Sequence, residues 1–137
     1  MLMREGFFMA LLYPGLFLFG GGCYLLLELL WRKRTHWSMG LIGGIAFLLL
    51  FLVFTRIGPE RLLLKGVVGA VMITAVEFLG GAVVNVQLKW NVWDYSSLPA
   101  NLYGQVCLLY SGLWFLLSMF VALIVQAIAQ VFGYSGL

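Results

Sequence analysis

Residues 66–88 read GVVGAVMITAVEFLGGAVVNVQL, an apolar stretch that is long enough to cross a bilayer. A membrane-spanning helix needs about 20 consecutive, mostly apolar residues. Near the middle of the stretch stands one acidic residue, Glu77. A carboxylate at the centre of a spanning helix costs about 2.5 kcal/mol or more, so it usually faces a partner or a water-filled cavity. The stretch therefore predicts a transmembrane helix with a polar site at Glu77.

The composition of the whole chain supports the same prediction. Of its 137 residues, 64% are hydrophobic and 9% are charged, whereas soluble domains carry about 25% charged residues. The mean hydropathy is +1.06. We expect a single integral membrane domain over residues 1–137, in the plasma membrane of a bacterium. The net charge of +3 comes from scattered basic residues, so we expect no nucleic-acid partner.

Hydropathy predicts four spans, and hence an all-α, four-helix transmembrane bundle. The expected spans are residues 6–31, 37–54, 64–88 and 101–132. Each side of the membrane would then hold four Lys or Arg residues, so the positive-inside rule gives no orientation. Two interpretations stay open. Either the chain inserts in both orientations and forms antiparallel dimers, or some basic residues, such as Lys65 inside the third span, do not act as orientation signals.

Small and polar residues recur along the third span at helical spacing. They are Gly66, Ala70, Thr74, Glu77, Gly81 and Asn85. Residues three and four apart share one face of a helix, so we call this set the small-residue stripe. It is interpreted either as a packing seam, since small residues let helices approach closely, or as one wall of a solute or ion pathway. In the second case Glu77 would exchange a proton, as a proton-coupled carrier requires.

The connection after the third span, residues 90–105, mixes aromatic and polar side chains. Those of interest are Trp93, Asp94, Tyr95, Ser96, Pro99, Asn101 and Gln105. One interpretation is a loop that is partly buried at membrane depth and reaches Asn85 and Glu77, with the positive end of the fourth helix aimed at them. The other is a surface turn within an aromatic belt.

Part of this region resembles the signature of a known family. The matching residues are Glu77, Trp93-Asp94-Tyr95-Ser96, Pro99, Asn101, Gly104 and Cys107. Over about residues 77–114 the pattern is similar to that of the ABC-transporter type IV (CmpB-like) family. The resemblance implies a role in membrane transport, and it marks Glu77, Trp93, Asp94, Tyr95, Ser96, Asn101 and Gly104.

The chain departs from the family pattern in two places. Gln105 stands where family members usually have an arginine, and residues 35–40 keep little of the usual first-loop motif. The family also implies an internal duplication, in which Glu28 and Gly40 parallel Glu77 and Gly104. A plainer interpretation of Glu28 is a salt bridge with the residue at i+4, Arg32.

We therefore expect a subunit of a solute or proton-coupled transporter. It would act as a homo-oligomer or with a partner membrane subunit, because four helices are few for a permease acting alone. The expected binding residues are Glu77, Asn85, Trp93, Asp94, Tyr95, Ser96, Asn101 and Gln105, with Glu28, Thr74, Gly81 and Gly104 as accessory residues.

The alternative function is a membrane assembly subunit whose small-residue stripe docks a partner protein. The sequence contains no P-loop, so we expect no nucleotide bound in that way. His36 is the only histidine and belongs to no metal-ligand cluster, so we expect no metal site. Neither a cofactor nor an enzymatic activity is expected.

Overall fold

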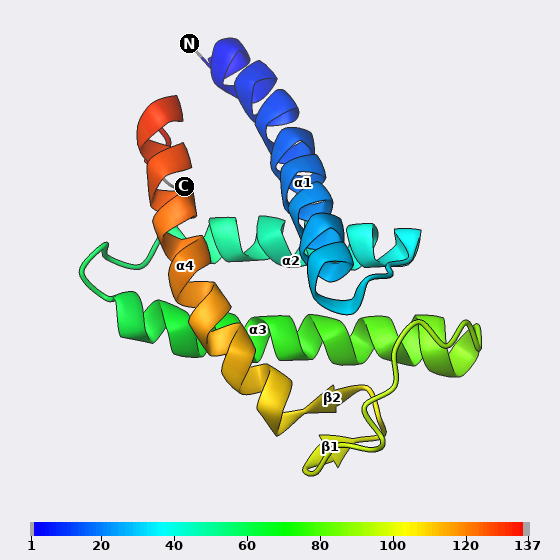
Figure 1. Ribbon diagram of the computed structural model, residues 1–137. Coiled ribbons are helices and arrows are strands. Elements are labelled where there is room, and N and C mark those ends of the chain that lie inside the picture. Colours follow the sequence, from blue (N-terminus) through cyan, green and yellow to red (C-terminus); the bar gives the residue numbers. More distant parts are fainter. Residues whose placement is uncertain (1, 136–137) are drawn as a thin grey trace. The chain divides into compact units, whose positions relative to one another are not determined.

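The computed structural model describes residues 2–135, and Figure 1 shows the order of their helices and strands. Helices α1 (Leu2–Arg32), α2 (Trp37–Phe54) and α3 (Leu62–Gly81) come first, and α3 continues as a π-helix, η1 (Ala82–Gln87). Strands β1 (Asn101–Leu102) and β2 (Val106–Cys107) precede α4 (Leu108–Phe132). The all-α prediction is confirmed, because within residues 2–135 four helices are long and apolar enough to cross a membrane.

The chain divides into two compact units between Leu48 and Leu49. In the first unit, glycines lie where α1 and α2 meet. A Cβ atom on Gly21 would lie 2.5 Å from the carbonyl oxygen of Gly40, and one on Gly43 would lie 2.6 Å from Cβ of Tyr24. Small residues at such positions let two helix backbones approach closely, which is a common way for helices to associate in membranes.

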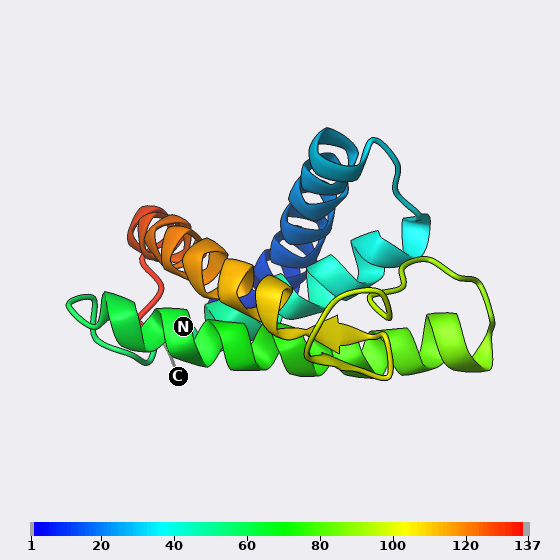
Figure 2. The same ribbon diagram turned by 60° about the horizontal axis from the view of Figure 1, so that its bottom comes forward.

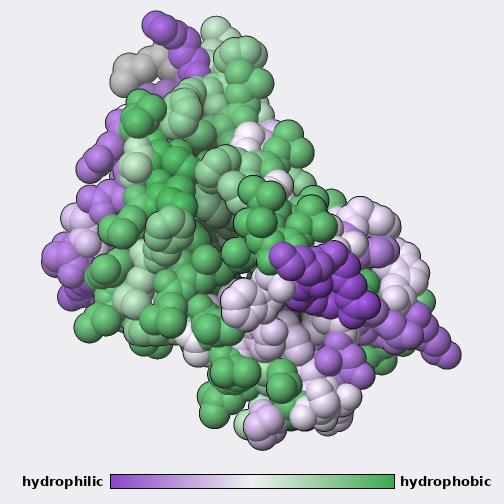
Figure 3. All heavy atoms as spheres, in the orientation of Figure 1, coloured by the Kyte–Doolittle hydropathy of each residue, from purple (hydrophilic) through white to green (hydrophobic). Residues whose placement is uncertain are grey.

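In the second unit, α3 packs against α4. Gly66 faces Phe115 and Met119 of α4, and Gly69 faces Ser118. Outward-facing side chains on both helices are large and apolar, as Figure 3 shows for α4; they include Leu63, Val67, Val71, Leu79, Leu109, Leu116 and Phe120. In an integral membrane protein these side chains contact lipid tails, so they need no protein cover.

The fourth helix begins at Leu108, and our expectation that it begins near Asn101 was wrong. Residues 101–107 form a short antiparallel hairpin in which Leu102 pairs with Val106. Its turn is closed by the N–H of Gln105, which donates to the carbonyl of Leu102 at 3.1 Å. Tyr103 and Gly104 in this turn have φ of 54° and 70°. Residues in the left-handed region cannot continue a right-handed helix, so α4 begins after them.

In both Figure 1 and Figure 2 the hairpin lies alongside α3 and does not extend beyond the end of that helix. The same arrangement follows from Gly81, where an added Cβ would meet Trp93 and Gln105. The connection is therefore folded back onto the helix that precedes it.

The third helix changes its winding where it approaches this connection. From Ala82 onward it is a π-helix, in which the N–H of Leu88 donates to the carbonyl of Val83 at 2.9 Å. The periodicity of the sequence predicted an α-helix throughout. Single π-helical turns are rare, and they occur frequently at functional sites.

Candidate functional site

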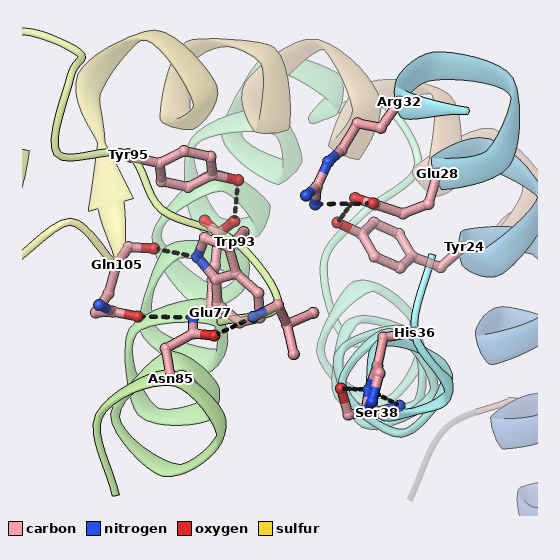
Figure 4. A network of polar contacts seen from close by, with 11 residues as sticks. Tyr24, Glu28, Arg32, His36, Ser38, Glu77, Asn85, Trp93, Tyr95 and Gln105 are labelled. Carbon is pink, nitrogen blue, oxygen red and sulfur yellow. Dashed lines mark hydrogen bonds and ion pairs between the residues drawn. The ribbon is translucent and has the colours of Figure 1, made fainter. Parts of the chain in front are cut away.

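Glu77 lies on α3 with 4% of its surface exposed. The hydroxyl of Tyr95 donates to its Oε1 at 2.8 Å, as Figure 4 shows, and the indole N–H of Trp114 donates to its Oε2 at 3.0 Å. The two donors stand 18 and 37 residues further along the chain, before β1 and on α4 respectively. Three separate parts of the second unit thus meet at one carboxyl group.

Aromatic packing fixes the direction of both donors. The ring of Tyr95 stacks on Tyr110, with centroids 4.7 Å apart and planes 15° apart. Tyr110 in turn packs at 6.0 Å against Trp114, which lies on the same face of α4 because the two are four residues apart. The hydroxyl and the indole N–H therefore reach Glu77 from a single aromatic cluster.

A second polar cluster lies about two helical turns further along the chain, where α3 has continued into η1. The side-chain amide of Asn85 on η1 donates to Oε1 of Gln105 at 2.9 Å, and Oδ1 of Asn85 accepts the N–H of Val92 at 2.7 Å. The indole N–H of Trp93 donates to the carbonyl of Gln105 at 2.9 Å. Figure 4 shows these side chains directed at one another beside Glu77. Gly81 leaves room for them, because its Cβ would lie 3.0 Å from Cζ2 of Trp93.

Asp94, Ser96 and Asn101, which we expected at the site, make hydrogen bonds within the connection. Oδ1 of Asp94 accepts the N–H of Ser96 at 2.8 Å, and the side chain of Asn101 bonds the carbonyl of Leu98 and the N–H of Gly104. Hydrogen bonds from the side chain and the backbone of Ser96 hold the pKa of Asp94 below its ordinary value. Gly104 is required here, because it has φ of 70° and its Cβ would lie 2.7 Å from Asp94.

The small-residue stripe faces α4 and the connection of the same chain. Thr74 shares a hydrogen bond of 2.8 Å with Ser111, Gly66 meets Phe115, and Gly81 meets Gln105. These contacts fit the packing-seam interpretation over the length of the stripe. Docking of a partner protein on the stripe stays a prediction.

Glu28 belongs to the first unit. Its Oε2 lies 3.0 Å from Nη1 of Arg32, and its Oε1 accepts a hydrogen bond of 3.0 Å from Tyr24. The salt bridge expected from the i,i+4 spacing is therefore present. A role shared with Glu77 stays a prediction.

Sequence reasoning missed the contribution of α4 to the site. Trp114, Tyr110 and Ser111 all contact residues that we had singled out, but none of them was predicted to do so. A signal was available, because Tyr110, Trp114 and Ser118 are spaced by four residues on a mostly apolar helix. Their polar atoms need partners inside a membrane, and only another part of the protein can supply them.

Replacing Tyr95 by phenylalanine keeps the ring stacked on Tyr110 but removes the donor to Glu77. We expect the free energy of unfolding to fall by about 1–3 kcal/mol, because a buried carboxyl group loses a hydrogen bond. Thermal unfolding in detergent measures the change. Tyr103→Phe is the matched control, since Tyr103 is 80% exposed, and it should change little. Equal losses in the two variants would contradict the assignment.

The sequence profile of a family described as Putative ABC-transporter type IV matches residues 11–135. No curated protein and no solved structure matched the chain.

Proposed function

The chain belongs to the Putative ABC-transporter type IV family, and we propose that it is a membrane-embedded transport subunit in which Glu77 binds and releases a proton. The family and the four apolar helices make the chain an integral membrane protein related to transport. The observation that carries the proton-exchange role is the environment of the Glu77 carboxyl group. Each of its oxygens has a neutral donor, and the two donors come from different segments.

The position of Glu77 along its helix supports the proposal. The span that includes α3 and η1 runs from Leu62 to Gln87, which is 26 residues. Glu77 stands ten residues before its end, or about 15 Å at 1.5 Å per residue, which is half of a hydrocarbon core about 30 Å thick. Ionisable residues at such depth are rare, and they commonly mark ion pathways and proton relays.

The two donors differ in a way that assigns the proton to one oxygen. An indole N–H can only donate, whereas a tyrosine hydroxyl can donate or accept. A proton on Oε1 could be donated to the oxygen of Tyr95 after its hydroxyl rotates, while Trp114 continues to donate to Oε2. Protonation of Oε2 would instead leave Trp114 only a hydroxyl oxygen, which is a weaker acceptor. We therefore assign the exchanged proton to Oε1, on the side of the connection that carries Tyr95.

In this proposal the other residues of the site are positioning groups. Asn85, Gln105 and Trp93 hold the connection against α3, so that the Tyr95 hydroxyl keeps its distance from Glu77. The small-residue stripe keeps α4, and with it Trp114, close to α3. Further copies of the chain or a partner subunit would complete the transporter, because four helices offer little surface for a pathway. The transported solute, if it differs from the proton, would bind beside this cluster.

The proposal is tested by proton uptake into lipid vesicles that contain the full chain and a pH-sensitive dye. After an external acid pulse, with the membrane potential clamped, wild-type vesicles should acidify faster than protein-free vesicles. Glu77→Gln should reduce uptake to the protein-free rate. The matched control is Glu60→Gln, because this carboxylate, with 72% of its side chain exposed, lies in the connection before α3.

Tyr95→Phe should slow uptake more than Trp114→Phe, because only Tyr95 can both donate and accept a proton. Uptake as fast in Glu77→Gln vesicles as in wild-type vesicles would reject the proposal. So would wild-type uptake no faster than that of lipid alone.

A further inference from the structure

The chain reverses direction after η1 and runs back along α3. Val92 is bonded to Asn85, the side chain of Trp93 lies against Gly81, and the hydroxyl of Tyr95 reaches Glu77. Successive residues of the connection thus meet successive turns of α3 in reverse order. The turn of the hairpin also lies against α3, since the ring centroid of Tyr103 lies 6.4 Å from that of Phe78.

These contacts place the connection below the membrane surface. The 26-residue span is about 39 Å long, which exceeds the hydrocarbon core by about 9 Å. Suppose that all of this excess length of about 9 Å extended out of the hydrocarbon core at the Gln87 end. Glu77, about 15 Å from that end, would still lie about 6 Å inside the core. Tyr95 and Tyr103, which contact Glu77 and its neighbour Phe78, reach the same level.

Part of the outer side of this segment, residues 94, 96 and 97, is polar and exposed. Asp94 stands between Trp93, which meets Gly81, and Tyr95, which meets Glu77, and its carboxylate is exposed. Ser96 and Ser97, which follow, are exposed as well. Non-helical backbone at membrane depth is tolerated only where protein buries it or where it lines a water-filled cavity. A carboxylate exposed to lipid tails at that depth would be costly.

We infer that residues 92–105 form a re-entrant segment whose exposed side, with Asp94, Ser96 and Ser97, lines a water-filled entrance leading to Glu77. The entrance opens on the side of the membrane where α3 ends and α4 begins. Water and hydrated protons, not lipid, would cover Asp94, Ser96 and Ser97. The inference rests on the proposed function only for the role of Glu77 at its inner end.

Cysteine accessibility tests the inference on the full chain in vesicles. Cys23 and Cys107 are first replaced, and single cysteines are introduced by Ser96→Cys, Val71→Cys and Glu60→Cys. Val71 is 65% exposed on α3 and serves as the lipid-facing control, whereas Glu60 is a water-exposed loop control. A charged, membrane-impermeant maleimide should label the Ser96→Cys and Glu60→Cys variants from opposite sides and leave the Val71→Cys variant unlabelled. Ser97→Cys serves as a second reporter should Ser96→Cys fail to fold.

The depth of the labelled residue is measured separately. A fluorophore on the Ser96→Cys variant should be quenched more strongly by a lipid with a nitroxide on its acyl chain than by one with a nitroxide at its headgroup. Absence of labelling at both reporters would overturn the inference, since lipid or protein would then cover the segment. Labelling with stronger quenching from the headgroup would also overturn it, because the segment would be a surface loop. Neither result depends on proton uptake. The role of Glu77 is therefore tested separately, by the uptake measurement with Glu77→Gln.

Discussion

Gly69→Ala should lower the free energy of unfolding by about 3 kcal/mol, the upper end of the usual cost of overpacking. A Cβ atom at this position would overlap Oγ and Cβ of Ser118 and would lie 2.9 Å from Cζ of Phe54. The Cβ of Ser118 cannot rotate away, because it is attached directly to the backbone of α4. The two helices must therefore separate, which withdraws Trp114 from Glu77. Thermal unfolding in detergent measures the loss, and proton uptake should fall with it.

The control and the rescue for this variant lie on α4. Gly112→Ala adds the same methyl group where no atom lies within 4 Å, so it should stabilise the exposed helix by about 0.5–1 kcal/mol. Ser118→Gly in the Gly69→Ala background removes the clashing side chain and should restore part of the loss. It also removes Oγ of Ser118, a buried oxygen that has no hydrogen-bond partner within residues 2–135. An unchanged unfolding temperature in Gly69→Ala would contradict the close packing of Gly69 against Ser118.

Gly21→Ala should destabilise the pair formed by α1 and α2 by a similar amount, about 3 kcal/mol. Its Cβ would lie 2.5 Å from the carbonyl oxygen of Gly40 and 3.3 Å from the carbonyl carbon. Both atoms belong to the backbone of α2, so no change of rotamer can relieve the overlap. Close approach of two backbones is what holds such a pair together in a membrane, and the added methyl group removes it. Thermal unfolding followed by far-ultraviolet circular dichroism measures the effect.

The adjacent residue provides the control for this second variant. Gly22→Ala places a methyl group where nothing lies within 4 Å, so it should be neutral or slightly stabilising. Gly40→Ala is expected to be intermediate, since its Cβ would meet only the movable side chain of Leu25, at 3.1 Å. If Gly21→Ala and Gly22→Ala behaved alike, the close approach of α1 and α2 would be refuted.

The small-residue stripe was predictable because it is a local property of one helix. The spacing of Gly66, Thr74, Glu77 and Gly81 follows from the 3.6-residue period alone. Their contacts with α4 and the connection agree with a shared face. The boundaries of α1, α2 and α3 were close to those expected for the same reason, since continuous apolar runs of this length form helices in a membrane.

The connection after α3 was less predictable. Hydropathy extended the fourth helix back to Asn101 because Leu102, Tyr103 and Val106 are apolar, but Ala100 and Tyr103 adopt a left-handed backbone with φ of 53° and 54°. A left-handed backbone is unfavourable for alanine and tyrosine, so the sequence does not predict it at these positions. This conformation depends on how the connection folds: the N–H of Val92 is bonded to Asn85 on η1, and the indole of Trp93 is bonded to the carbonyl of Gln105.

The amino-acid sequence by itself determined that the chain is a membrane protein with four helical spans and that one carboxyl group lies deep in the third. These properties depend on the polarity of neighbouring residues and on their period, both of which can be read along the chain. Only the tertiary structure decided that Tyr95 and Trp114 are the donors to Glu77, that Asn85 pairs with Gln105, and that Asp94 stays exposed. Each polar atom in a membrane needs a partner, but many donors would satisfy it, and the packing of α4 and the hairpin on α3 selects among them.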